Sequence, residues 1–167
     1  PKLIAVVTPS NIVRCSNDPA TTFTASGSNT FPAYTFSPSG ITGSDPVYSV
    51  GPSATTVYTM TANNSNGCKD TVAFRVTVNP APTMTITSPL YHCPGTTVAI
   101  TNTASANVIS YTWSPASTLS NSNTAIPISS ASVNTTYNYT VVTADNCKLT
   151  SNVAVNLRPA PVVNAGV

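Results

Sequence analysis

The sequence predicts an all-β protein made of two tandem β-sandwich domains and the start of a third. Short alternating runs of Val, Ile, Tyr, Phe and Thr are interrupted by Pro, Gly, Ser and Asn, which is typical of strands and turns. No window shows helical periodicity. The same pattern also occurs twice along the 167 residues. We therefore assign residues 1–79 to the first domain, 80–159 to the second and 160–167 to the third.

The internal repeat can be followed residue by residue. AYTFSP at 33–38 returns as SYTWSP at 110–115, so Phe36 corresponds to Trp113, 77 residues later. The other correspondences are Cys15 with Cys93, Tyr58 with Tyr137 and Cys68 with Cys147, at spacings of 78, 79 and 79 residues. Each copy ends in Pro-Ala-Pro, within VNPAPTMTI and then LRPAPVVNA. The slow drift in spacing indicates loop insertions between two copies of one fold.

Seven short strands fit into the first copy. Alternating β-forming residues predict them at 3–8, 12–15, 21–25, 33–37, 47–50, 56–62 and 71–78. Turn-forming residues separate them at 16–19, 26–29, 37–40 and 63–67. Proline falls between strands or at their edges, where its missing N–H costs least.

Composition excludes several kinds of partner. Charged residues make up 6% of the chain, against roughly 25% in an ordinary soluble domain. The net charge of +2 comes from scattered residues, so no basic patch is predicted for nucleic acid. No apolar run reaches the length of a membrane span, so no membrane insertion is expected. The chain starts without Met or a signal peptide, so we expect it to be an internal piece of a longer protein.

The residue types needed for catalysis or metal binding are not grouped. His92 is the only histidine, and we expect it on a surface loop. The four aspartates fall singly in predicted turns, where Asp usually caps its own backbone. No nucleophile–base or acid–base set can be assembled, so we predict no enzyme, no metal site and no cofactor. Four cysteines without metal-site spacing favour disulfides, and hence an extracellular location.

Several of these segments together resemble a known class of repeat. SYTWSPASTLS, NTTYNYTVVTADNC, the PVVNAG opening and the Pro-Ala-Pro joints are similar to the tandem Ig-like or PKD-like repeats of giant secreted surface proteins of Bacteroidetes. These include gliding and surface adhesins exported by type IX secretion. The resemblance implies two immunoglobulin-like (PKD-like) sandwiches end to end, at the cell surface or secreted.

The role implied by the resemblance is a non-catalytic structural module of a stalk or fibre that supports adhesion. Its partners would be neighbouring repeats of the same chain, like chains in a fibre, or surface polysaccharide. The alternative is a carbohydrate-binding or accessory module of a secreted glycoside hydrolase. Exposed Tyr91 or Tyr48 would then provide the sugar-stacking surface.

The spacing of an immunoglobulin sandwich assigns core residues in each copy. Phe36 and Trp113 each lie 13 residues after an apolar residue of the predicted strand B, as the strand C tryptophan of that fold does. Tyrosines near the start of strand F fit a tyrosine corner. Apolar residues then occupy the place of the usual second Cys. The predicted core is Phe23, Phe36, Tyr58, Met60, Ile100, Trp113, Tyr137 and Tyr139.

The cysteines lie outside the positions of the usual internal bridge. Cys15 and Cys93 fall before strand B, and Cys68 and Cys147 fall after strand F. In the assumed topology these shifts place the two cysteines of one domain at its opposite ends. We therefore favour a bridge between Cys15 and Cys147, with Cys68 and Cys93 bonded to neighbouring modules. The alternative is Cys15–Cys68 with Cys93–Cys147.

One short motif predicts a modification. Asp70-Thr71-Val72 resembles the Asp-Ser/Thr-aliphatic O-glycosylation site of the same bacteria. Thr71 is therefore the candidate for a glycan.

Overall fold

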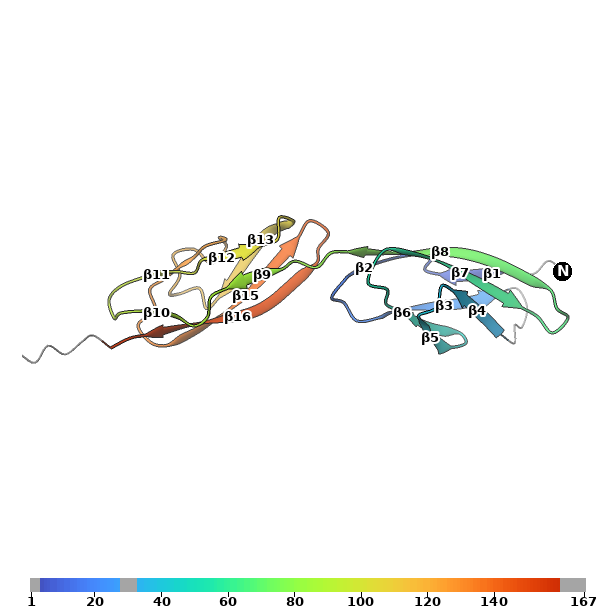
Figure 1. Cartoon of the computed structure of the whole chain (residues 1–167), viewed down its shortest axis with the longest axis horizontal. Helices are drawn as coiled ribbons and strands as arrows, with labels where there is room; N and C mark the ends of the chain where they lie inside the picture. The colour runs from blue at the N-terminus through green and yellow to red at the C-terminus, as the bar shows by residue number, and fades with distance from the viewer. Residues whose placement is uncertain (1–3, 28–32, 160–167) are drawn as a thin grey trace, which may run out of the picture. The chain divides into compact units, whose positions relative to one another are not determined.

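The computed structural model describes residues 4–27 and 33–159, and it divides the chain into two compact units, Pro1–Pro80 and Ala81–Val167. The described residues form strands, turns and irregular connections, with no helix among them (Figure 1). Each unit is an immunoglobulin-like β-sandwich, so the chain is a tandem of two such domains. The expected third repeat at 160–167 lies outside the described residues.

The first sheet of unit 1 is antiparallel throughout. Its order is β1-β3-β6-β5, with bounds Ala5–Thr8, Thr21–Gly27, Val47–Val50 and Ile41–Ser44. This is the arrangement of the ABED sheet of an immunoglobulin sandwich. Strand β5 was not expected from the sequence, because ITGS has a single large apolar residue and no alternation.

The second sheet of unit 1 contains the long strands. Its order is β2-β8-β7-β4, with bounds Asn11–Cys15, Lys69–Asn79, Thr56–Asn63 and Ala33–Ser37. Strand β2 pairs with β8 in parallel, whereas β8–β7 and β7–β4 are antiparallel. The chain crosses from the first sheet to the second within the short connection between β1 and β2. Because Cys15 pairs with Asn79, strand β2 ends level with the end of β8.

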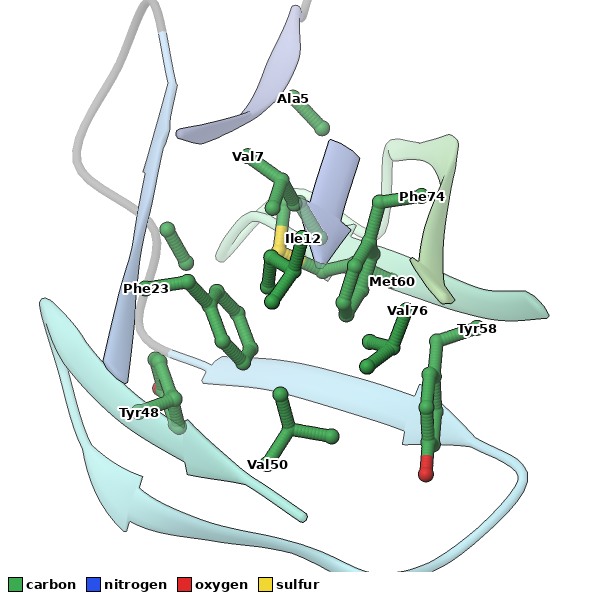
Figure 2. Close-up of a cluster of buried hydrophobic side chains, with 12 residues drawn as sticks. Ala5, Val7, Ile12, Phe23, Tyr48, Val50, Tyr58, Met60, Phe74 and Val76 are labelled. Atoms are coloured by element: carbon green, nitrogen blue, oxygen red, sulfur yellow. The ribbon is translucent and has the colours of Figure 1, made fainter. Parts of the chain in front are cut away.

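The core of unit 1 lies between the two sheets, where alternate side chains of both meet (Figure 2). Phe23 is at its centre, with ring centroids 4.9 Å from Phe74 and 5.7 Å from Phe36. Tyr58 and Met60 are buried, and Phe36 is half-buried at the margin of the core. Tyr48, which the sequence left as a candidate surface ring, is buried too.

Unit 2 repeats the larger sheet in the order β10-β16-β15-β13. The bounds are Leu90–His92, Lys148–Leu157, Thr135–Thr143 and Val108–Ser114. Strand β10 again runs parallel to the last strand, β16. The opposite layer consists of two short ladders: β9 (Met84–Ile86) with β12 (Asn102–Ala104), and β11 (Val98–Ala99) with β14 (Ile128–Ser129).

The core of unit 2 is built around the aromatic residues Trp113, Tyr137 and Tyr139. Ile100 lies between β11 and β12 and is fully buried. Trp113 packs against Tyr139 with ring centroids 5.1 Å apart, and its indole N–H donates to the Thr124 carbonyl at 2.9 Å. The hydroxyl of Tyr137 bonds to the hydroxyls of Thr118 and Ser129, at 2.6 and 2.8 Å. Tyr137 thus contacts side-chain hydroxyls, whereas a tyrosine corner contacts the backbone.

Candidate functional site

The candidate site consists of the four cysteines, whose side chains can form covalent bonds. Each cysteine lies at or next to a turn at one end of a sandwich. Cys68 is in the turn between β7 and β8, and Cys147 is in the matching turn between β15 and β16. Cys15 ends β2, and Cys93 directly follows β10. The site is therefore a set of two turn types, each of which occurs once in each unit.

The turns that hold Cys68 and Cys147 are built by the same hydrogen bonds. In unit 1 the Asn64 amide donates to the Cys68 carbonyl at 3.0 Å, and the Cys68 amide donates to the Asn64 side-chain oxygen at 2.9 Å. In unit 2 the Thr143 amide donates to the Cys147 carbonyl at 2.9 Å, and the Cys147 amide donates to the Thr143 hydroxyl at 3.1 Å. Asn and Thr thus provide the same side-chain acceptor.

The residue before the cysteine is left-handed in both of these turns. Gly67 has φ of 78° and Asn146 has φ of 62°. Glycine adopts this conformation without steric cost, and Asn tolerates it better than most other residues. The two sequences differ here, yet both residue types satisfy the same backbone requirement.

The turns that hold Cys15 and Cys93 also match. The Asp18 amide donates to the Cys15 carbonyl at 3.1 Å, and the Thr96 amide donates to the Cys93 carbonyl at 3.1 Å. A side chain reinforces each turn. The Asp18 carboxylate accepts the Cys15 amide at 2.7 Å, and the Thr96 hydroxyl donates to the Cys93 carbonyl at 2.8 Å. Asp18 therefore caps its own turn, as the sequence suggested.

The strand register places the two cysteines of each unit far apart. In unit 1 Cys15 is level with Asn79, and Cys68 immediately precedes the 11-residue strand β8 that ends at Asn79. At 3.3 Å per residue the two cysteines are separated by about 35 Å. In unit 2 Cys93 and Cys147 lie at opposite ends of the 10-residue strand β16. A disulfide needs Cα atoms within about 7 Å, so this register does not permit a bridge inside either unit.

The four cysteines are in two different oxidation states. Cys15 and Cys147 each take part in a disulfide bond. Cys68 and Cys93 are free cysteines, and both are exposed. One turn of each type is therefore oxidised and one is reduced.

A buried polar residue lies directly before the cysteine at the end of β2 and of β10. Arg14 is 7% exposed, and its guanidinium donates to the carbonyls of Pro52, Asp18 and Pro19. The corresponding residue of unit 2 is His92, which is also 7% exposed and whose Nδ1 lies 3.1 Å from the Cys93 carbonyl. The expectation that His92 lies on a surface loop was wrong. It belongs to strand β10 and points inward, as Arg14 does in unit 1.

One candidate sugar-stacking ring is exposed on the described part of the chain. Tyr91 is 45% exposed, and the Arg158 guanidinium carbon lies over one face of its ring, 4.4 Å from the centroid. A cleft of about 290 Å³ is lined by residues of the paired strands β9 and β12 and by residues next to them: Thr85, Ile86, Thr87, Thr101, Asn102 and Thr103. None of these side chains has an aromatic ring to stack on a pyranose.

The remaining candidate residues lie on strands or in single turns. Thr71 is exposed on β8, opposite Thr61 of β7. The preceding Asp70 accepts the Ala5 amide of β1 at 2.7 Å and so ties the first strand to the sandwich. Among residues 4–27 and 33–159, no three His, Cys, Asp or Glu side chains are grouped as a metal site. Within the same ranges the chain has no helix of the length and apolarity that a membrane span requires.

Comparisons with known proteins place this geometry in a fold but not in a family. No family model matches the chain, and no curated protein matches it. Among solved structures, the C-terminal fragment of intimin in complex with the intimin-binding domain of its translocated receptor aligns with a TM-score of 0.54. It is 13% identical, and the match covers 94% of this chain and 66% of that one.

Two further structures align less closely. The insect immune protein hemolin gives a TM-score of 0.46 at 14% identity, covering 89% of this chain and 45% of that one. SGBP-B of the Bacteroides ovatus mixed-linkage glucan utilization locus, in complex with a heptasaccharide, gives 0.37 at 15% identity, covering 91% and 47%. The chain thus spans between about half and two thirds of the length of these proteins. At 13% identity, the intimin alignment supports the immunoglobulin-like fold alone.

Proposed function

We propose that this chain is a non-catalytic structural repeat of a longer extracellular, cell-surface protein, in which tandem sandwiches form a stalk or fibre that supports adhesion. The observation that carries the proposal is the placement of equivalent cysteine turns at opposite ends of two equivalent units. Such an arrangement suits a series of modules joined end to end. The sequence resemblance to gliding and surface adhesins of Bacteroidetes, exported by type IX secretion, supports attachment at the cell surface.

The proposal includes a covalent connection between units. We place the bridge between Cys15 and Cys147, because both residues are disulfide-bonded and the register rules out a partner within either unit. In the parent protein Cys68 would bond to the preceding module and Cys93 to the following one. Each linker would then be bypassed by a disulfide.

Peptide mapping under non-reducing conditions tests the bridge directly. Cleavage before Asp18, Asp45, Asp70 and Asp145 places each cysteine on its own peptide, at residues 1–17, 45–69, 70–144 and 145–167. Alkylation of free thiols before digestion should label 45–69 and 70–144. We expect 1–17 to be recovered joined to 145–167. Recovery of 1–17 with 45–69, and of 70–144 with 145–167, would contradict the bridge and the end-to-end model.

The gene that encodes the parent protein tests the stalk itself. A stalk requires many similar copies of the unit in one chain, whereas an accessory module of a glycoside hydrolase requires one or two copies beside a catalytic domain. The accessory role has weaker support, because one candidate sugar-stacking ring, Tyr48, lies in the core of unit 1, and the Arg158 guanidinium occupies one face of the other, Tyr91. Retention of the chain on an immobilised polysaccharide, lost on Tyr91→Ala, would favour that role instead.

A further inference from the structure

We propose that Tyr91 and Arg158 of unit 2 form a binding site for the uronic acid residues of an acidic polysaccharide. The inference goes beyond the proposed function, because the site lies within one unit and needs neither the stalk nor the Cys15–Cys147 bridge. The ligand class follows from the side chains that meet at this place and from the charges of unit 2.

The strand register places the two side chains next to each other. Tyr91 is the middle residue of β10, and it pairs with Asn156 of the parallel strand β16. Arg158 directly follows β16, and its amide donates to the His92 carbonyl at 2.9 Å. This bond continues the parallel ladder one residue beyond β16. The backbone therefore holds both Tyr91 and Arg158 in place.

The two side chains form an exposed surface that combines an aromatic ring with a cation. Tyr91 is 45% exposed, and Arg158 is exposed as well. The guanidinium carbon lies 4.4 Å from the centroid of the ring, in a cation–π contact. This contact restricts the long arginine side chain before any ligand arrives. The surface is therefore preformed and open to solvent.

Unit 2 has no carboxylate near Arg158. Residues Ala81–Val167 contain one acidic side chain, Asp145. Asp145 lies in the turn before β16, whereas Arg158 follows the other end of this 10-residue strand. At 3.3 Å per residue the two residues are roughly 30 Å apart. Unit 2 thus presents a cation that its own side chains do not neutralise, and an anionic ligand complements it.

Unit 1 shows that the fold itself does not require this pair. In its parallel β2–β8 ladder Val13 pairs with Thr77, and Asn79 is the last residue of β8. Val13, which is 60% exposed, takes the place of the tyrosine, and Asn79 takes the place of the arginine. The same backbone frame is therefore built without a ring or a cation. The Tyr91–Arg158 pair is an addition specific to unit 2.

A uronic acid residue matches both parts of this surface. The C–H face of a pyranose ring can stack on the exposed part of the tyrosine ring. Its planar carboxylate can accept two parallel N–H bonds from the guanidinium, a geometry that arginine favours. An acidic peptide offers the carboxylate without the ring, and a neutral sugar offers the ring without the carboxylate. The combination favours an acidic sugar.

Side-chain amides next to the pair can bind the hydroxyls of neighbouring sugar residues. Asn156 lies beside Tyr91 in the register and is half-buried. Asn134 lies across β16 from β10, and its side-chain oxygen accepts the Leu157 amide at 2.8 Å. The NH₂ group of Asn134 takes no part in that bond and can donate to a hydroxyl. Two strand spacings, about 10 Å, separate Asn134 from β10, so the surface suits a chain of sugars.

Titration of the isotope-labelled chain with tetragalacturonate, followed by NMR, tests the site. We expect the amide signals of Tyr91, Asn156 and Arg158 to shift, and that of Val13 at the equivalent place in unit 1 to stay. Arg158→Gln should weaken binding at least about tenfold, because it removes a charge-assisted pair. Arg75→Gln is the matched control, since it removes an exposed arginine of β8 in unit 1, and it should leave the affinity unchanged.

Two further ligands separate the acidic sugar from its component parts. The methyl ester of tetragalacturonate keeps the rings without the carboxylates, and tetraglutamate carries carboxylates without the rings. Each should bind at least about tenfold more weakly than tetragalacturonate, because each loses one of the two contacts. An ester that binds equally well to the wild-type chain and to Arg158→Gln would indicate neutral sugar stacking and would overturn the inference. Tetraglutamate that binds equally well would show a general anion site and would overturn it too.

Absence of binding at millimolar tetragalacturonate, or an equal loss in both arginine variants, would also refute the site. The non-reducing peptide map of the same samples keeps this result separate from the proposed function. A Cys15–Cys147 peptide without sugar binding would refute the polysaccharide site alone. Sugar binding without that peptide would refute the bridge between units and leave the site in unit 2 intact.

Discussion

At the scale of single residues, the Tyr137 hydroxyl is the clearest polar link inside a core. It bonds to Thr118 and to Ser129, whose side chain is fully buried. Tyr137→Phe should destabilise unit 2 by about 1 to 3 kcal/mol, because it leaves buried hydroxyls without this partner. Urea unfolding followed by the fluorescence of Trp113, the only tryptophan of the chain, reports on unit 2 alone.

A double-mutant cycle serves as the control for this prediction. If the hydrogen bond carries the effect, Thr118→Val should cost less in the Tyr137→Phe background than in the wild-type chain. Fully additive losses would instead assign the effect to packing.

Thr71 remains the candidate for a glycan, and its exposed position on β8 would let a sugar project without disturbing the core. We expect the tryptic peptide 70–75 of protein from the native host to carry additional hexose-type mass. Thr71→Ala should remove the added mass, and Thr61→Ala on the neighbouring strand should leave it in place. Native peptide found only in unmodified form would rule the site out.

At the scale of the structural element, the β7–β8 turn depends on a left-handed residue. A Cβ at Gly67 would meet no atom within 4 Å, so Gly67→Ala tests backbone conformation without a steric clash. The cost should be about 1 kcal/mol, seen as faster amide exchange in β7 and β8. Ser65→Ala, in the same turn, is the matched control. Equal exchange rates in both variants would show that the conformation of residue 67 is not required.

Because tyrosines are buried in the core of unit 1, the stability of that unit should fall at high pH. Burial raises the pKa of Tyr58, and burial together with Asp45 raises the pKa of Tyr48. Folding therefore favours the protonated phenols, so their contribution is complete below the unfolded pKa of about 10 and is lost as the pH rises through the folded pKa. Tyrosinate absorbance should appear together with loss of the sheet signal in circular dichroism. Tyr58→Phe should shift both changes to higher pH, and free titration of folded tyrosines would contradict the prediction.

Sequence patterns predicted most strands but not all of the topology. Alternation located β3, β4, β6, β7 and β8 within two residues, because each places apolar side chains on one buried face. Strand β5 was missed because its edge position buries little and demands no alternation. The inward orientation of His92 was missed because a three-residue strand has no readable period. The repeat aligns His92 with Arg14, the residue before Cys15, and the structure buries both side chains.

At the scale of the whole chain, the four cysteines are organised by the repeat. Each unit has one turn of each type, on opposite ends of its longest sheet, so every unit offers a different cysteine to each neighbour. This polarity gives a series of units a direction. It also explains why cysteines that are far from the position of the usual inter-sheet bridge occur at equivalent places in both copies.

The proposed Cys15–Cys147 bridge should restrict the motion of the two units. Pro80, Ala81 and Pro82 form a short connection, which is semi-rigid, but interfaces between domains of one chain are often mobile. Spin labels on noncanonical residues in place of the exposed Val57 and Ile109 would report the inter-unit distance distribution without using cysteine. We expect Cys15→Ser with Cys147→Ser to broaden this distribution, and Cys68→Ser with Cys93→Ser to leave it unchanged. If the distribution stays equally narrow without the first pair, the bridge does not restrict the units and has no mechanical role.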